Sequence, residues 1–316
     1  MNVLITGGMG VIGSMVSSLF VQEGYRPVIM GRHLDRSLIR LIEDKVDIEL
    51  GDILDLPRLL SIIQSYNITH IIHTAAILSE LSHKNPPQSI KISVMGTLNV
   101  LEAARFMKVQ RVVYSSAKGV YGYTRGEYGP PTLKPIPEDY PKNPVTIYAI
   151  AKNMCENMGR FYQRTYGLEF VALRYSSTYG PGKLVRHGGK SYISRVVEGA
   201  YLGKTVKFQK GGDQKGDIIY NRDTARGIYL ACTAPEPHYQ AYNIGTGIAV
   251  AFKDIASEVK RLIPNADIEI GPGTEGPSNN NVLDITRARE DLGFSPKFSL
   301  REAIEDYLET IRKLGF

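Results

Sequence analysis

The chain has 316 residues, enough for one large or two modest domains with a buried core. Hydrophobic residues make up 43% and charged residues 22%, which is ordinary for a soluble globular protein, and no apolar run approaches the length of a membrane span. The net charge of +6 comes from scattered basic residues rather than a basic block, which argues against a nucleic-acid partner.

The cysteines and histidines of the chain bear on whether the protein has disulfides or a metal site. Cys155 and Cys232 are too few for a disulfide framework or a cysteine metal site, and the histidines show no spacing of a known metal site. We therefore expect no metal. Because the first predicted strand begins at Asn2, we also expect no signal peptide, and a cytoplasmic protein.

The first half of the chain alternates short apolar strands with helices. Strands are predicted at Asn2–Thr6, Pro27–Gly31, Val46–Leu50, Thr69–Thr74, Arg111–Ser115 and Glu169–Tyr175. Helices are predicted at Gly10–Glu23, Leu34–Glu43, Leu56–Ser65, Gln88–Met107 and Val145–Tyr166. This alternation predicts an α/β fold with a doubly wound parallel sheet, in which ligands lie at the carboxyl ends of the strands.

The character of the chain changes after Tyr175, where strands become short and loops long. We interpret this part as a smaller C-terminal substrate domain. One stretch, Asn221–Gly245, reads as a helix and a strand that return to the main sheet. The predicted dinucleotide-binding domain therefore comprises residues 1–175 and about 221–246, and the predicted substrate domain comprises 176–220 and 247–316.

A glycine-rich turn joins the first strand to the first helix. Gly7 permits the tight turn, Gly10 lets the backbone approach a pyrophosphate, and Gly13 lets the helix pack against the strand. Val11 and Ile12 begin the helix, whose N-terminus then faces the phosphates. The pattern predicts a dinucleotide site.

The end of the second strand bears on the choice between NAD and NADP. NAD enzymes usually place an acid there, but this strand ends in Gly31-Arg32-His33. Arg32, with Arg36 nearby, would suit a 2′-phosphate, so NADP is the preferred cofactor and NAD remains open.

Two further segments are expected to line the cofactor site. Asp52 and Ile53 follow the third strand, where they would meet the adenine. Ala75 and Ala76 follow the fourth strand, and their small side chains allow the nicotinamide half of the cofactor to lie close to the backbone.

Tyr148 and Lys152 are four residues apart on one predicted helix and therefore share a face. A lysine ammonium at this spacing would lower the pKa of the phenol and bind the nicotinamide ribose. The tyrosine would then serve as acid or base at a carbon that gives or takes a hydride. With the glycine turn, the pair points to a nicotinamide-dependent enzyme.

The ordered motifs resemble the extended short-chain dehydrogenase/reductase family, which includes the nucleotide-sugar epimerases and dehydratases. The resemblance rests on segments along nearly the whole chain: Thr6–Gly13, Gly51–Ile53, His73–Ala76, Gly96–Glu102, Ser115-Ser116, Val120–Gly122, Tyr148–Lys152, Leu173–Tyr175, Tyr179–Gly182 and Asn243–Gly245. It implies a Rossmann-type domain, a bound nicotinamide cofactor, a catalytic Tyr/Lys pair and a homodimer formed through helices of the main domain.

Two departures from the family pattern concern the catalytic region. The family expects a Ser or Thr at the position of Ala117, and Ser116 lies one residue earlier. An alanine cannot hydrogen-bond the reacting oxygen, so either Ser116 substitutes for the missing hydroxyl or a loop threonine does. The candidate threonines are Thr124, Thr132 and Thr146. Ser93 stands where the family often has an Asn, and it retains hydrogen-bonding capacity.

Two more departures concern the substrate. Nucleotide-sugar enzymes commonly carry an Asn where this chain has Ser177, and an Arg where it has Gly216. Both losses weaken the case for a nucleoside diphosphate. The basic segment that follows Gly182 includes Lys183, Arg186 and His187, and is read either as an anion-binding lip or as a solvated loop.

The leading hypothesis is an NADP- or NAD-dependent oxidoreductase or epimerase acting at a hydroxyl-bearing carbon of a sugar or sugar-like small molecule. Tyr148 would be the acid/base, Lys152 its partner, and Ser116 the polarising hydroxyl. One alternative is a nucleotide-sugar 4-epimerase with tightly bound NAD. An alternative of another class is a non-catalytic NADP-sensing protein, which Ala117 would favour.

Overall fold

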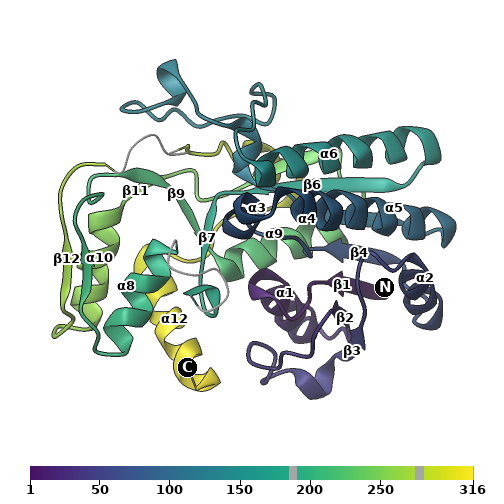
Figure 1. The fold of residues 1–316 in the computed structure, drawn as a ribbon, viewed down its shortest axis with the longest axis horizontal. Coiled ribbons are helices and arrows are strands. Elements are labelled where there is room, and N and C mark those ends of the chain that lie inside the picture. Colours follow the sequence, from purple (N-terminus) through teal and green to yellow (C-terminus); the bar gives the residue numbers. More distant parts are fainter. Residues whose placement is uncertain (185–190, 275–280, 316) are drawn as a thin grey trace.

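A seven-stranded parallel sheet forms the centre of the computed structural model, which describes residues 1–184, 191–274 and 281–315. Its spatial order is β10-β6-β5-β4-β1-β2-β3 (Figure 1). The strands are β1 (Val3–Thr6), β2 (Val28–Gly31), β3 (Asp47–Leu50), β4 (His70–His73), β5 (Arg111–Ser115), β6 (Glu169–Tyr175) and β10 (Ala241–Ile244). The strand order reverses between β1 and β4, so the ligand crevice of such a sheet lies at their carboxyl ends. The predicted α/β class and parallel sheet are confirmed.

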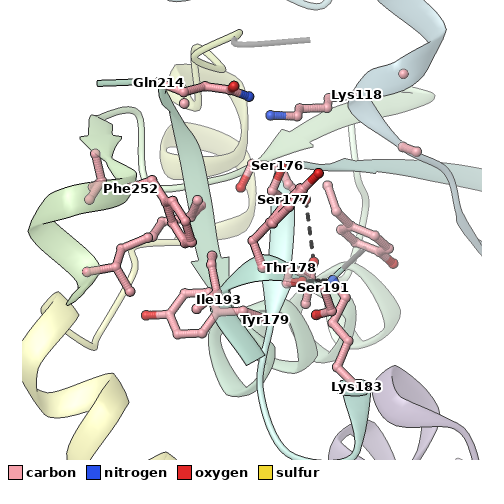
Figure 2. A pocket seen from close by; sticks show the side chains of 18 of the residues that line it. Lys118, Ser176, Ser177, Thr178, Tyr179, Lys183, Ser191, Ile193, Gln214 and Phe252 are labelled. Atoms are coloured by element: carbon pink, nitrogen blue, oxygen red, sulfur yellow. Dashed lines mark hydrogen bonds between the residues drawn. The ribbon is translucent and has the colours of Figure 1, made fainter. Parts of the chain in front are cut away.

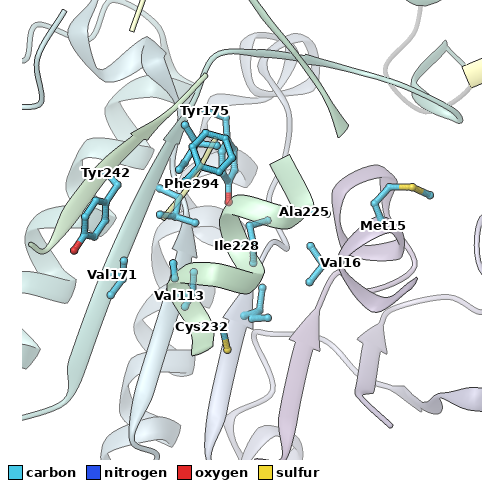
Figure 3. Close-up of a cluster of buried hydrophobic side chains, with 14 of the residues drawn as sticks. Met15, Val16, Val113, Val171, Tyr175, Ala225, Ile228, Cys232, Tyr242 and Phe294 are labelled. Carbon is cyan, nitrogen blue, oxygen red and sulfur yellow. The ribbon is translucent and has the colours of Figure 1, made fainter. Parts of the chain in front are cut away.

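Helices cover both faces of this sheet, because successive side chains of each strand point to opposite faces and both sets are apolar. One face carries α1 (Val11–Gln22) and α9 (Asn221–Thr233), which pack on each other. Figure 3 shows this core, with Val113 and Val171 of the sheet beneath Ile228 of α9. The other face carries α2 (Leu56–Ser65), α5 (Gly96–Phe106) and α6 (Ile147–Tyr166).

The helix predicted at Gln88–Met107 is interrupted. The structure has α3 (Ser79–Lys84), α4 (Pro86–Ile90), a π-helical turn at Lys91–Met95, and then α5. Ser93 lies within the π turn, and its hydroxyl accepts a hydrogen bond from the Ile77 N–H at 3.4 Å. Its carbonyl accepts from the Thr97 hydroxyl at 2.6 Å.

The helix predicted at Leu34–Glu43 is wrong. The segment forms successive turns and a short 3₁₀ helix, η1 (Glu43–Lys45). The Asp35 carboxylate accepts from the backbone N–H and the hydroxyl of Ser37 at 3.0 and 2.6 Å, a local bond that competes with helix formation. The backbone N–H groups of Ile39 and Ile42 each donate to the carbonyl three residues earlier. The side chains of both isoleucines are buried.

Smaller elements follow β6. β7 (Ser177–Tyr179), β9 (Lys215–Tyr220) and β11 (Ala249–Ala251) form a three-stranded sheet, and β8 (Val206–Phe208) pairs with β12 (Ile268–Ile270). They lie among α8 (Tyr192–Tyr201), α10 (Phe252–Leu262) and α12 (Leu300–Leu314), to the left in Figure 1, and have a core of their own. A further helix, α11 (Thr286–Leu292), packs on β10.

The predicted return of the chain to the main sheet is confirmed, since β10 pairs in parallel with β6 and α9 covers the sheet. The exact division into two domains stays a prediction. The predicted loop Gly119–Pro144 contains two short 3₁₀ turns, η3 (Lys118–Tyr121) and η4 (Gly126–Tyr128), and an isolated β-bridge between Ile136 and Leu283. No helix among the described residues has the length and apolar character needed to span a bilayer.

A buried ion pair joins α6 to β6. The Arg174 guanidinium donates to both carboxylate oxygens of Glu156, at 3.0 and 2.7 Å, and both side chains are 1% exposed. Arg174 also donates to the Tyr121 hydroxyl at 2.9 Å and to the Glu138 carbonyl at 2.8 Å. Tyr121 donates in turn to Asn243 of β10 at 2.6 Å. We call these five residues the Glu156–Arg174 network.

Replacing Glu156 by Gln keeps its shape but leaves the Arg174 charge buried and unpaired. We expect Glu156→Gln to lower the free energy of unfolding by about 3–5 kcal/mol. Urea-induced unfolding at neutral pH measures this loss. Glu305→Gln is the control, because its pair with Arg301 is exposed and such pairs contribute about 0–1 kcal/mol.

The same comparison has a predicted pH dependence. Burial raises the pKa of Glu156, but the hydrogen bonds and charge of Arg174 outweigh it and hold the pKa below its ordinary 4.5. The advantage of the native chain over Glu156→Gln is therefore complete above pH 4.5 and is lost as the pH falls through the lowered pKa. Equal stabilities at neutral pH would contradict the role given to this pair.

Candidate active site

A cavity of about 600 Å³ lies between the carboxyl end of the main sheet and the elements that follow β6. One wall is formed by Ser116–Gly119, Thr146 and Tyr148, and another by Tyr175–Tyr179. Ile12, at the start of α1, also lines it, so the cavity reaches the glycine turn. The predicted cofactor-binding turn and the predicted catalytic residue Tyr148 therefore border the same cavity.

The glycine turn has the backbone that the sequence predicts. Gly7 has φ +70°, and a Cβ there would lie 2.8 Å from Thr74 Oγ1 and 2.9 Å from the Ala75 nitrogen. A Cβ at Gly13 would lie 2.2 Å from the Gly7 carbonyl oxygen. Side chains are therefore excluded at Gly7 and Gly13, so no side chain covers the backbone of the turn. The free N–H groups in the first turn of α1 are directed to this surface. This geometry fits a dinucleotide pyrophosphate.

The proposed adenosine side shows one change from expectation. Arg32 is exposed, whereas the Arg36 guanidinium is directed at the Glu43 carboxylate, so the predicted clamp on a 2′-phosphate is not preformed. Asp52 accepts a hydrogen bond from the Leu54 N–H at 2.9 Å. Ile53 is buried against α5, where a Cβ at Gly96 would lie 2.4 Å from its Cδ1.

The small residues after β4 lie beside the glycine turn. Ala75 is within 3 Å of the position that a Gly7 Cβ would occupy, and Ala75 and Ala76 are both partly exposed. His73 is not available for chemistry, because its ring nitrogens bond Thr6 and Thr97 at 2.6 and 3.0 Å and burial lowers its pKa to about 3.

Tyr148 and Lys152 lie on the first turns of α6, which begins where the Thr146 hydroxyl accepts from the Ala149 N–H at 3.2 Å. Tyr148 lines the cavity, whereas Lys152 is 2% exposed and donates to the Ser115 carbonyl. The Lys152 ammonium lies 5.6 Å from the centroid of the Tyr148 ring. The structure thus brings the pair together at the cavity wall.

The predicted lowering of the Tyr148 pKa by Lys152 stays a prediction, and burial opposes it. Burial raises the pKa of Tyr148 to about 12, because the phenolate loses its hydration. Burial also lowers the pKa of Lys152 to about 8, against the opposing effects of Cys155 and Glu156. The ammonium is directed to a backbone carbonyl rather than to the phenol oxygen.

The hydroxyl of Ser116 is bonded to the Glu156–Arg174 network. It donates to Glu156 Oε1 at 2.6 Å, and the side chain is 2% exposed. Ala117 lines the cavity without a polar group. Of the loop threonines, Thr146 lines the cavity, and its hydroxyl caps α6. The role of Ser116 as polarising group stays a prediction.

The opposite wall holds the predicted substrate residues. Ser177 and Lys183 both line the cavity, and the Lys183 ammonium donates to the Thr178 carbonyl. Figure 2 shows Lys183 beside Thr178, with Lys118 and Ser176 toward the other end. The predicted residues Arg186 and His187 lie outside the described part of the chain.

Sequence reasoning missed several cavity residues. Lys118 directly follows Ala117 and Ser176 directly precedes Ser177, so their proximity to predicted residues was the available signal. The far end also carries an aromatic group formed by Tyr192, Phe208 and Phe252, whose ring centroids are 5.1 to 5.9 Å apart. No local pattern predicts that group, because its members come from three separate elements.

Comparison with known proteins agrees with this geometry. A family model described as the NAD dependent epimerase/dehydratase family matches residues 3–245. A UDP-glucose 4-epimerase of Mycolicibacterium smegmatis is 28% identical over 318 residues, covering 99% of each chain.

Two solved structures are similar over their whole length. The UDP-glucose 4-epimerase of Thermotoga maritima, solved with UDP-glucose, has a TM-score of 0.88 at 28% identity and covers 100% of both chains. That of Thermus thermophilus, in complex with NAD, has a TM-score of 0.85 at 26% identity, with 99% of each chain covered. With its motifs in place, the chain belongs to the NAD dependent epimerase/dehydratase family and is an NAD(P)-dependent enzyme of the extended short-chain dehydrogenase/reductase type.

Proposed function

We propose that this enzyme is a nucleotide-sugar 4-epimerase that uses NAD. The observation that carries the proposal is the Tyr148–Lys152 pair at one end of a cavity whose other end is aromatic and whose described lining includes lysines but no carboxylate. Such a cavity suits a sugar, a diphosphate and a base in that order. The relatives that are UDP-glucose 4-epimerases support it. The broader hypothesis of an oxidoreductase acting on a sugar hydroxyl is compatible with this reading.

The cofactor would be held by the glycine turn, with Gly7, Gly10 and Gly13 providing the uncovered backbone and Val11 and Ile12 the first helical N–H groups. When bound, NAD supplies a hydride acceptor and, once reduced, a hydride donor. Lys152 would bind the nicotinamide ribose. NAD is proposed over the NADP favoured by the sequence, since Arg36 is paired with Glu43 and a solved relative is in complex with NAD.

Tyr148 would hold the proton of the reacting hydroxyl. Taking that proton requires the phenolate, which burial disfavours and a nearby positive charge favours. Lys152 is the positive group that this chain supplies. An epimerase returns the same proton to the oxygen in its second half-reaction, so Tyr148 need not exchange protons with solvent between the two steps. This suits a phenol at the inner wall of the cavity.

Replacing Tyr148 by Phe removes the only atom that would carry this proton while keeping the ring. We expect Tyr148→Phe to lower kcat for interconversion of UDP-glucose and UDP-galactose by about 10²- to 10⁴-fold. A coupled assay of the product measures it. Tyr123→Phe is the control, because Tyr123 is exposed and does not line the cavity. Full turnover by Tyr148→Phe would sink the proposed mechanism.

The cofactor proposal has its own test. Protein denatured directly after purification should release NAD, identified by mass, at close to one per chain. Titration of cofactor-free protein should then show tighter binding of NADH than of NADPH, and Arg32→Ala should leave NADH binding unchanged because NADH carries no 2′-phosphate for an arginine to bind. Released NADP, or selective NADPH binding that Arg32→Ala abolishes, would restore the original prediction.

A homodimer is proposed through α5 and α6. These adjacent helices, with the last residue of the π turn before α5, expose large apolar side chains: Met95, Phe106, Ile150, Met154, Phe161 and Tyr166. Exposed apolar groups of this size mark interaction surfaces. The free, buried thiols Cys155 and Cys232 agree with the predicted cytoplasmic location.

Light scattering coupled to size-exclusion chromatography should therefore give twice the mass of 35.1 kDa for the native chain. The double variant Met154→Glu with Phe161→Glu should run as a monomer, since it would place charges in the interface. Ile248→Glu, on an exposed residue far along the chain, is the control and should stay dimeric. A monomeric native chain at micromolar concentration would refute the dimer.

A further inference from the structure

The cavity is lined by an excess of positive charge. Among its described lining residues are four lysines, Lys118, Lys183, Lys210 and Lys215, and no Asp or Glu. Charges of one sign on a low-dielectric wall reinforce one another and attract ions of the opposite sign. The lining therefore favours an anionic ligand, and the buried lysines show where its charge would lie.

Lys118 is a buried lysine of the cavity wall that directly follows Ser116 and Ala117. It is 9% exposed, and within the described part of the chain the acceptor of its ammonium is the Asp217 backbone carbonyl, at 3.4 Å. The Asp217 carboxylate is occupied elsewhere, accepting from the Thr246 N–H at 2.9 Å and the Leu283 N–H at 3.1 Å. Burial lowers the pKa of Lys118 to about 8, so its charge persists at neutral pH without a carboxylate bonded to it.

Ser176 is an unpaired hydroxyl on the same wall. Its side chain is 5% exposed, it lines the cavity, and its Oγ has no hydrogen-bond partner among the described residues. Strand register places it near Lys118, because Ser177 pairs with Ile218 and Ser176 therefore lies level with Asp217. A buried hydroxyl without a partner is unfavourable, and a hydrogen bond to a ligand oxygen would recover that cost.

We propose that Lys118 Nζ and Ser176 Oγ together bind an anionic oxygen group of the substrate, either a phosphate of its diphosphate or a carboxylate on its sugar. We call this pair the Lys118–Ser176 subsite. The inference rests on the proposed function, whose substrate it specifies. It also offers a replacement for the family's Asn and Arg, which are lost at Ser177 and Gly216. The positive charge is supplied by Lys118, from the segment after β5, instead of by an arginine at the position of Gly216.

Isothermal titration of the full-length protein tests the subsite with UDP, UDP-glucose, UDP-glucuronate and uridine as probes. Lys118→Met keeps the length of the side chain and removes its charge. We expect it to weaken binding of the anionic probe that uses the subsite at least about tenfold, which is 1.4 kcal/mol, and to leave uridine unchanged. Ser176→Ala should weaken the same probe, and Lys118→Arg should retain part of the affinity.

The probes separate the two sources of the charge. Weaker binding of UDP and UDP-glucose identifies the diphosphate, whereas weaker binding of UDP-glucuronate alone identifies a sugar carboxylate. Lys134→Met is the control, since Lys134 is an exposed lysine paired with Glu127 outside the cavity. Affinities within twofold of the native chain for every anionic probe would overturn the proposal, as would a native chain that binds none of them.

Failure of the proposed function is distinguishable from failure of the subsite. If the native chain binds UDP-sugars through Lys118 but does not epimerise them, the function is wrong and the subsite stands. If it epimerises them and Lys118→Met changes kcat with no change in KM or in any Kd, the subsite is wrong and the function stands. Thermal unfolding of each variant shows whether it has folded.

Discussion

The bidentate pair between Glu156 and Arg174 is the interaction on which the rest of the site depends. It is formed between a helix and a strand of the main sheet, and it holds the segment after β5 through Ser116 and Tyr121. If one partner of a buried ion pair is removed, the charge of the other stays buried, where neither water nor an opposite charge compensates it. The first turns of α6, which carry Tyr148 and Lys152, are therefore positioned by charges that the cavity itself never contacts.

The same network holds the segment that contains Ala117, the residue that stands where the family expects a Ser or Thr. The neighbouring serine serves the network, and the next residue, Lys118, extends across the cavity to the backbone of β9. One short segment thus supplies a structural hydroxyl, an apolar wall and a cation within three residues. The chemical end and the substrate end of the cavity are linked through this segment, so substitutions in it should affect both.

Most of the fold could be predicted because its signals are local. Apolar runs of four to seven residues gave the sheet strands, and Gly7 and Gly13 gave the turn, since each depends on its immediate neighbours. The choice between NADP and NAD stays a prediction, and the pairing of Arg36 with Glu43 could not be read from the sequence, because it depends on the turns between the two residues. The Ser116 hydroxyl is directed at Glu156 of α6, and the Lys118 ammonium at the Asp217 carbonyl of β9, and both partners are distant in the chain. The helix predicted at Leu34–Glu43 is replaced by turns, because the Asp35 carboxylate accepts a hydrogen bond from the Ser37 N–H, which periodicity does not detect.

The π turn at Lys91–Met95 has a consequence for insertions and deletions. A π turn contains one residue more than the α-helical path would need, and each residue rotates a helix by about 100°. The extra residue sets the phase of α5, so that Gly96 faces Ile53 and Thr97 faces His73. Homologues that lack one residue in this turn would need contacts other than Gly96–Ile53 and Thr97–His73 between α5 and the sheet. A single deletion in the turn should therefore disturb the cofactor site more than any substitution in it.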